Sequence, residues 1–217
     1  MSLTLIKKSI CDLEKDLKLT PSLTKIIAVS KLQPNDRVEA VLEEGHRIFG
    51  ENRVQEAAGK WPQFKKKFQN IELHLLGPLQ SNKVRQAMQL FSFIHTVDSL
   101  KLAKRISFIR GDLGFCPKLF IQVNTGRESQ KAGVCLDQLG PVAETCKELK
   151  LPVVGLMCIP PVDESPLYHF NLLKDFAKTF GLPELSMGMS NDFETAIALG
   201  ATHIRVGEAV MGPRAKF

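Results

Sequence analysis

The sequence predicts an α/β protein built as a single-domain (β/α)8 barrel, the TIM-barrel fold, with an extra helix at the N-terminus. Three observations lead to this prediction: short apolar runs alternate with amphipathic segments, the runs number eight, and no Gly/Ser-rich linker divides the 217 residues. Strict alternation implies parallel strands with right-handed crossovers. Eight such units fit a closed barrel better than the alternative, an open doubly wound sheet. We therefore expect one domain over residues 1–217.

The elements follow one another in a regular order. The extra helix is expected at about residues 3–17. The eight predicted strands are short and apolar, as buried parallel strands are, and lie at 26–31, 47–50, 72–77, 93–97, 119–124, 153–159, 185–190 and 203–207. Segments with helical spacing separate them, at 35–44, 53–68, 81–90, 99–109, 136–149, 167–180 and 192–199. Several of these segments open on an N-cap residue type, such as Asn35, Ser81 or Ser165.

Composition and charge fit a globular protein and argue against several other classes. Hydrophobic residues make up 44% of the chain and charged residues 24%. No stretch approaches the roughly 20 apolar residues of a membrane span, and residues 1–18 lack the apolar core of a signal peptide. The five cysteines are an odd number without C-x-x-C spacing, which argues against zinc and disulfides. Because the net charge of +6 is spread along the chain, we expect a cytoplasmic protein that binds no nucleic acid.

Lys31 is the most informative residue among those that end the predicted strands. In a (β/α)8 barrel the carboxyl ends of the strands form one mouth, where active sites lie. Lys31 closes the first apolar run, where burial would lower its pKa and free its amine to attack a carbonyl. The alternative is a lysine that has left the strand and extends into solvent.

The last two strands carry candidate residues for an anion. Strand alternation places Arg205 and Gly207 on the inner face, where a buried guanidinium needs an acceptor. A structural ion pair with a carboxylate such as Glu51 is the alternative. Segment 186–192 ends a strand and opens a helix, so its backbone N–H groups and the Ser190 hydroxyl can bind an anion, although serine is also a common N-cap.

Barrel closure brings these two features together. The first strand pairs with the eighth, so Lys31 and the anion site are expected to be neighbours. A ligand that carries both an aldehyde and a phosphate would span them. Pyridoxal 5'-phosphate (PLP) is one such ligand, and a sugar phosphate is another.

Seven segments spread over nearly the whole chain resemble a known family. They are AVSK at 28–31, FGENRVQEA at 49–57, HLLGPLQSNK at 74–83, IQVN with KAG at 121–124 and 131–133, GLMCIP at 155–160, LSMGMSNDFETAIALGATHIRVG at 185–207 and MGPR at 211–214. In this order they are similar to the pyridoxal phosphate homeostasis proteins. Seven motifs in family order are far more specific than any single one.

The resemblance implies a barrel like the N-terminal domain of alanine racemase, with PLP in aldimine linkage to Lys31. Ser190 and the backbone around Gly207 would hold the phosphate, Arg205 would face the pyridine nitrogen, and Asn52 would lie near the ring. An arginine opposite that nitrogen keeps it unprotonated, which weakens the ring as an electron sink. This favours carrying the cofactor over carbanion chemistry.

Three further positions bear on the site that the resemblance implies. Glu208 stands where the family often has Thr or Ser, so it either points away from the phosphate, leaving the backbone N–H to bind it, or weakens the site by repulsion. Lys83 and Lys131 match recurrent family lysines. They are expected to be either secondary PLP sites or ordinary surface lysines.

Three functions are compatible with these residues. The first is a non-catalytic PLP-binding protein of PLP homeostasis that passes PLP to PLP-requiring apoenzymes. The second is a PLP-dependent amino-acid racemase-like enzyme, which needs an acid or base on each face of the substrate; we expect no second domain to supply one, and the only tyrosine, Tyr168, lies near the start of the sixth helix. The third is a Schiff-base aldolase. The resemblance favours the first.

Overall fold

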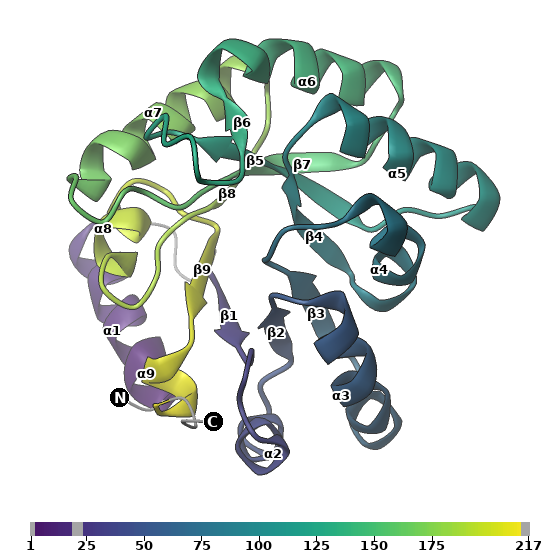
Figure 1. The fold of residues 1–217 in the computed structure, drawn as a ribbon. Helices are drawn as coiled ribbons and strands as arrows, with labels where there is room; N and C mark the ends of the chain where they lie inside the picture. Colours follow the sequence, from purple (N-terminus) through teal and green to yellow (C-terminus); the bar gives the residue numbers. More distant parts are fainter. Residues whose placement is uncertain (1–2, 19–23, 214–217) are drawn as a thin grey trace.

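The strands of the protein close into a parallel barrel surrounded by helices, in a computed structural model that describes residues 3–18 and 24–213 (Figure 1). The eight barrel strands are β1 Lys25–Val29, β2 Ile48–Glu51, β3 Glu72–Leu75, β4 Phe93–Val97, β5 Lys118–Asn124, β7 Val153–Cys158, β8 Glu184–Ser186 and β9 His203–Val206. Their order is β4-β3-β2-β1-β9-β8-β7-β5, and β4 pairs with β5 to close the ring. The predicted (β/α)8 barrel is therefore confirmed, and the doubly wound sheet is wrong.

Helices follow the strands and cover the outside of the barrel (Figure 1). They are α1 Leu3–Asp16, α2 Asn35–Glu43, α3 Val54–Lys67, α4 Val84–Leu90, α5 Leu100–Leu113, α6 Leu136–Glu148, α7 Pro166–Thr179, α8 Phe193–Ala198 and α9 Glu208–Met211. The extra helix α1 packs against α8 and α9. Local signals set some ends: Ser99 accepts a hydrogen bond from Leu102 N, and Gly114 ends α5 with φ +76°.

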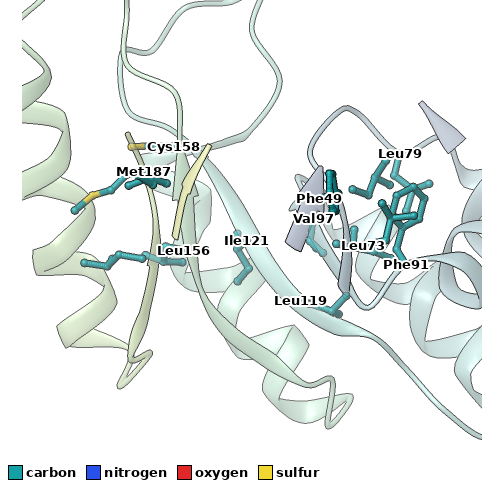
Figure 2. Close-up of a cluster of buried hydrophobic side chains, with 14 of the residues drawn as sticks. Phe49, Leu73, Leu79, Phe91, Val97, Leu119, Ile121, Leu156, Cys158 and Met187 are labelled. Atoms are coloured by element: carbon teal, nitrogen blue, oxygen red, sulfur yellow. The ribbon is translucent and has the colours of Figure 1, made fainter. Parts of the chain in front are cut away.

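The apolar core has an outer and an inner part. The outer part fills the space between the strands and the helices, where Leu73 on β3 and Leu156 on β7 point outward (Figure 2). The inner part lies inside the barrel and is formed by Phe93, Phe120 and Met157. Burial on both faces explains why the strands read as continuous apolar runs.

Three local features differ from the sequence prediction. Strand β1 ends at Val29 and not at Lys31, because Ser30 N donates to Gly50 O, Gln33 N donates to Ser30 O, and Leu32 takes a left-handed φ of +56°. The seventh predicted strand ends at Ser186, four residues early. A short strand, β6 Val134–Cys135, adds to β5 in the loop before α6 and was not predicted.

Candidate functional site

A cavity of about 560 Å³ opens where the β1, β2, β7, β8 and β9 strands end. All six residues singled out in the sequence line it, namely Lys31, Asn52, Ser190, Arg205, Gly207 and Glu208. Apolar side chains complete the wall, among them Val29, Leu76, Ile159 and Met189. The structure thus brings the candidate residues together, and the ligand that they hold stays a prediction.

Lys31 lies in the turn after β1, half-buried, between the buried Ser30 and the exposed Leu32. Hydrogen bonds hold the backbone on both sides of it. Lys60 Nζ donates to Ser30 O over 2.8 Å, the Ser30 hydroxyl donates to Glu51 Oε1 over 2.7 Å, and Leu32 N donates to Glu56 Oε1 over 2.7 Å. The turn is therefore fixed by side chains from β2 and α3.

These supporting groups form a buried charge cluster behind the turn. Lys60 Nζ lies 3.1 Å from Glu51 Oε1 and 3.0 Å from Glu56 Oε1, and Trp61 Nε1 donates to Glu51 Oε1 over 3.0 Å. Burial raises the pKa of Glu51, whereas the Lys60 ammonium and the Ser30 hydroxyl oppose that rise. An ammonium with two carboxylates nearby keeps this cluster compensated.

Arg205 points into the barrel from β9, as strand alternation predicts, and reaches the cavity wall. Its Nη1 donates to Ser186 Oγ over 2.9 Å, and its Nη2 donates to Cys158 O over 2.8 Å. The alternative of an ion pair with Glu51 is wrong, because Glu51 pairs with Lys60. Both acceptors of the guanidinium are neutral groups on β8 and β7.

The loop after β8 shapes the side of the cavity where an anion was expected. Gly188 has φ +93°, and a Cβ there would lie 2.7 Å from the Ala196 Cβ, so glycine is required. Asp192 Oδ1 accepts from Met189 N over 2.5 Å, which closes a tight turn around the exposed Ser190. The N-cap of α8 is Asp192, two residues beyond Ser190, so Ser190 is not that cap.

The loops after β2 and β9 provide the remaining predicted residues. Asn52 is half-buried, and its carbonyl is so close to Gly77 that a Cβ on residue 77 would lie 2.1 Å from the Asn52 oxygen. Gly207 follows β9 and stands at the N-cap of α9, whose first residue is the exposed Glu208. Close backbone packing therefore sets the position of Asn52.

The two lysines proposed as secondary sites do not line the cavity. Lys83 lies in a short 3-10 helix at Ser81–Lys83. Lys131 forms an ion pair with Glu128, 2.6 Å between Nζ and Oε2, and donates to Pro160 O over 3.4 Å. Since Pro160 belongs to the wall, Lys131 is the nearer candidate, and a secondary role for either lysine stays a prediction.

Several residues that build this site were missed in the sequence. Lys60 and Glu56 support the turn, and Gln33 lines the cavity while its Nε2 donates to Gly212 O over 3.1 Å. The i,i+4 spacing of Glu56 and Lys60 in a predicted helix signals an ion pair. Nothing in that spacing shows that the pair is buried.

Other kinds of site are absent from the part of the chain that the structure describes. Within residues 3–18 and 24–213, no group of three or more His, Cys, Asp or Glu side chains is placed to hold a metal ion. No helix in those ranges is long and apolar enough to cross a membrane. All five cysteines have free thiols.

The sequence matches known proteins over most of its length. The family model described as alanine racemase, N-terminal domain, matches residues 16–215. Proteins named pyridoxal phosphate homeostasis protein from Escherichia coli K12 and Pseudomonas aeruginosa are 35% and 40% identical to it, over 90% and 89% of this chain and 88% and 86% of theirs.

Solved structures share the fold. PipY of Synechococcus elongatus, solved without PLP, has a TM-score of 0.84 at 38% identity; the PLP-bound form has 0.79 at 37%. Each comparison covers 94% of this chain and 100% of PipY. An alanine racemase of Clostridium difficile has a TM-score of 0.67 at 16% identity, over 93% of this chain and 55% of the racemase, and is alike in fold alone.

Proposed function

Because the chain belongs to the family of the pyridoxal phosphate homeostasis proteins and has the alanine racemase N-terminal domain, we propose that it binds PLP and acts in intracellular PLP homeostasis as a non-catalytic carrier. One observation carries the proposal: the six residues that the sequence singled out for PLP line one cavity. Its volume of about 560 Å³ lies in the usual range for small-molecule sites.

The lining of the cavity fits the chemistry of the cofactor. When bound, PLP supplies an aldehyde that condenses with a primary amine and releases water. Lys31 is the only lysine among the residues that line this cavity in the described chain, so its amine is the candidate for that bond. Val29, Leu76 and Met189 offer apolar surface for a ring.

Charged and polar groups divide between the two ends of such a ligand. Ser190 and the backbone at Gly207 lie in the loops after β8 and β9, which supports their proposed role in holding a phosphate. The Arg205 guanidinium supports recognition of the pyridine nitrogen, and Asn52 would lie near the ring. Glu208 stands beside Gly207 in the wall, and its side chain is the one group here that would repel a phosphate.

A carrier role is favoured over a racemase by what surrounds Lys31. A racemase needs a second acid or base across the ring from the lysine. Tyr168, the only tyrosine of the sequence, is exposed on α7 and does not line the cavity. We propose that PLP-requiring apoenzymes receive the cofactor. The five free thiols fit a reducing compartment, the cytoplasm.

Borohydride reduction followed by peptide mass spectrometry tests the assignment. Reduction of the PLP-loaded protein should leave a pyridoxyl adduct on Lys31, and Lys31→Ala should remove the visible absorbance of the bound cofactor. Lys83→Ala and Lys131→Ala are the matched controls and should keep it. An adduct only on Lys83 or Lys131, or a Lys31→Ala protein that stays yellow, would overturn the assignment.

Two further assays separate the carrier from the alternatives. The loaded protein should neither racemise nor decarboxylate L-alanine, L-serine or ornithine faster than free PLP, and clear turnover would favour a racemase-like enzyme. An aldolase would be colourless, and borohydride would trap a sugar phosphate on Lys31 without PLP.

A further inference from the structure

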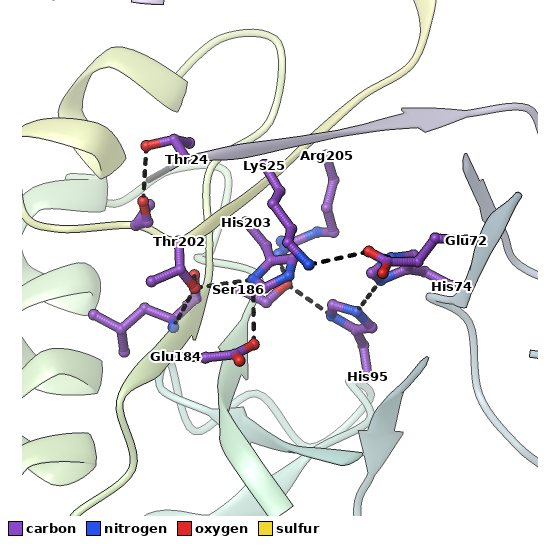
Figure 3. Close-up of polar contacts among 12 residues, drawn as sticks. Thr24, Lys25, Glu72, His74, His95, Glu184, Ser186, Thr202, His203 and Arg205 are labelled. Atoms are coloured by element: carbon purple, nitrogen blue, oxygen red, sulfur yellow. Dashed lines mark hydrogen bonds and ion pairs between the residues drawn. The ribbon is translucent and has the colours of Figure 1, made fainter. Parts of the chain in front are cut away.

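A second polar cluster lies inside the barrel, outside the wall of the cavity except at Arg205. Its core consists of His74 on β3, His95 on β4 and His203 on β9, all of them buried (Figure 3). Lys25 and Glu72 stand at the N-terminal ends of β1 and β3, and so at the mouth opposite the cavity. Nothing in the proposed function accounts for these groups.

An unbroken series of contacts connects the opposite mouth to Arg205 (Figure 3). Lys25 Nζ donates to Glu72 Oε1 over 3.2 Å, and Glu72 Oε1 lies 3.1 Å from His74 Nε2. His74 Nδ1 lies 2.8 Å from His95 Nε2, and His95 Nδ1 lies 2.9 Å from Ser186 Oγ. Arg205 Nη1 donates to Ser186 Oγ over 2.9 Å. Below, "the barrel chain" means Glu72, His74, His95, Ser186 and Arg205.

The charges at the two ends of the barrel chain are fixed. Burial alone would raise the pKa of Glu72, but the hydrogen bond and charge of His74 and the Lys25 ammonium outweigh it and bring the pKa to about 2. Burial lowers the pKa of His74 and sets that of His95 well below its ordinary value. At neutral pH the chain therefore joins a carboxylate and a guanidinium through two uncharged imidazoles.

These charges give every hydrogen bond in the barrel chain one direction. A carboxylate only accepts, so His74 must donate from Nε2 and accept at Nδ1. His95 must then donate from Nε2 and accept at Nδ1 from the Ser186 hydroxyl. The Ser186 oxygen is left to accept from Arg205, which only donates. The carboxylate at one mouth thus orients the hydroxyl at the other.

We propose that Ser186 and His95, backed by His74 and Glu72, are positioning residues that hold the Arg205 guanidinium in the cavity wall. The acceptors of Arg205 are a hydroxyl and the Cys158 carbonyl, both neutral. A hydroxyl can rotate, and it presents its oxygen to Arg205 only while its own proton is engaged by His95. The consequence for PLP rests on the proposed function, whereas the direction of the hydrogen bonds does not.

The structure also allows the nitrogens of the histidines to be tested apart from their packing. His74 stacks on Phe93 with centroids 4.4 Å apart and an interplanar angle of 3°, and His95 stacks on Phe120 at 4.3 Å and 16°. A phenylalanine at either position keeps a ring in the stack and removes only the nitrogens. His203 touches the same rings but lies outside the barrel chain, since its Nδ1 contacts Thr202 Oγ1 at 2.9 Å. It is therefore the matched control.

The first experiment reads the tautomers of the protein without PLP. Nitrogen-15 histidine spectra at neutral pH should show His74 and His95 as neutral rings protonated at Nε2. A His95 ring protonated at Nδ1, or a charged His74, would overturn the directed chain. This outcome does not depend on whether PLP binds.

The second experiment measures PLP binding by absorbance titration in a mutant cycle. His95→Phe and Ser186→Ala should each weaken PLP binding about tenfold, the scale of one hydrogen bond to a charged group, and should shift the visible band of the bound cofactor as Arg205→Lys does. His203→Phe should stay within about twofold of the parent. In the Arg205→Lys background His95→Phe should have no further effect, because it acts through Arg205.

The cycle also has outcomes that contradict the proposal. Equal losses from His95→Phe in both backgrounds would show that His95 acts on the fold and not through Arg205. Circular dichroism of each variant checks that it is folded, and Ser186→Ala is the smaller change if His95→Phe is not. A parent protein that binds no PLP would overturn the proposed function, while the tautomer spectra would still decide the chain.

Discussion

Glu51 and Lys60 form a buried ion pair directly behind the turn that carries Lys31. Oε1 and Nζ lie 3.1 Å apart, and the side chains are 0% and 9% exposed. The same Lys60 ammonium holds the Ser30 carbonyl next to Lys31 in sequence. The cavity therefore rests on two different supports, a charge cluster under Lys31 and a series of neutral hydrogen bonds under Arg205.

Lys60→Met tests the first support. The variant keeps a chain of similar length but leaves the Glu51 carboxylate buried without its cation. We expect the free energy of unfolding to fall by about 3–5 kcal/mol, the usual cost of breaking one half of a buried pair. Urea denaturation of the protein without PLP measures it.

Two controls show whether the charge is responsible for that loss. Lys66→Met, at an exposed position of the same helix, should change the free energy of unfolding by no more than about 0.5 kcal/mol. Adding Glu51→Gln to Lys60→Met should recover part of the loss, because the unpaired charge is removed. A double variant that is less stable by the sum of both single losses would contradict this account.

The barrel could be predicted from the sequence because its repeat is regular, whereas the supports under the site could not. The turn at Lys31 depends on a left-handed φ of +56° at Leu32, which leucine rarely adopts and which no local pattern signals. Strand β6 has only two residues, too few to show any period. Lys60 looks like any lysine four positions after a glutamate, and its burial follows only from how α3 packs on β2.

The candidate site could be predicted further than its surroundings, because its residues end successive strands. Topology alone then places Lys31 and Arg205 at one mouth. The interior histidines were within reach of the same reasoning: His74 and His95 lie on two predicted strands, and alternation decides which residues face inward. Their mutual contacts depend on strand register, which the sequence does not specify.

Gly77→Ala should disturb the wall of the cavity at Asn52. A Cβ at residue 77 would lie 2.1 Å from the Asn52 carbonyl oxygen, so the backbone after β2 must move. We expect a loss of about 1–3 kcal/mol in the free energy of unfolding, together with weaker PLP binding. Thermal unfolding and absorbance titration measure the two effects.

Gly111→Ala is the matched control for that substitution. Gly111 lies within α5, and a Cβ there meets nothing within 4 Å. Alanine should therefore raise the free energy of unfolding by up to about 1 kcal/mol through its helix propensity. Equal losses at both positions would show that the collision at Asn52 is not the cause.

Glu208→Ser should strengthen binding of a phosphate group in the cavity. The exposed carboxylate lines the wall beside Gly207, and its negative charge opposes a second one. Because exposure screens this repulsion, we expect PLP to bind about two- to fivefold more tightly at low salt. Titration at two ionic strengths measures it, with Glu194→Ser, an exposed glutamate of α8 that does not line the cavity, as the control.

The salt dependence of that gain is part of the prediction. An increase that persists unchanged at about 1 M salt could not come from charge. Weaker binding of PLP by Glu208→Ser at every ionic strength would mean that the glutamate supports the site through its contacts.

Acid should destabilise the protein through its buried histidines, and His46 and His203 give the clearest window. Burial lowers the pKa of His46 from 6.5 to about 4 and that of His203 from 6.5 to about 3. The unfolded chain then binds protons below pH 6.5 that the folded protein refuses until pH falls through those lower values. Each histidine thus stabilises the fold above pH 6.5, and its contribution is lost as the pH decreases.

The slope of stability against pH measures this effect apart from its absolute level. His46→Gln keeps a donor for Ile48 O, which His46 Nε2 contacts at 2.8 Å, and cannot titrate. Between pH 6 and 5 its free energy of unfolding should decline less steeply than that of the parent, by about 1.4 kcal/mol per pH unit. His203→Phe should reduce the slope by the same amount. Parallel curves for the parent and both variants would show that these rings are already protonated in the folded protein.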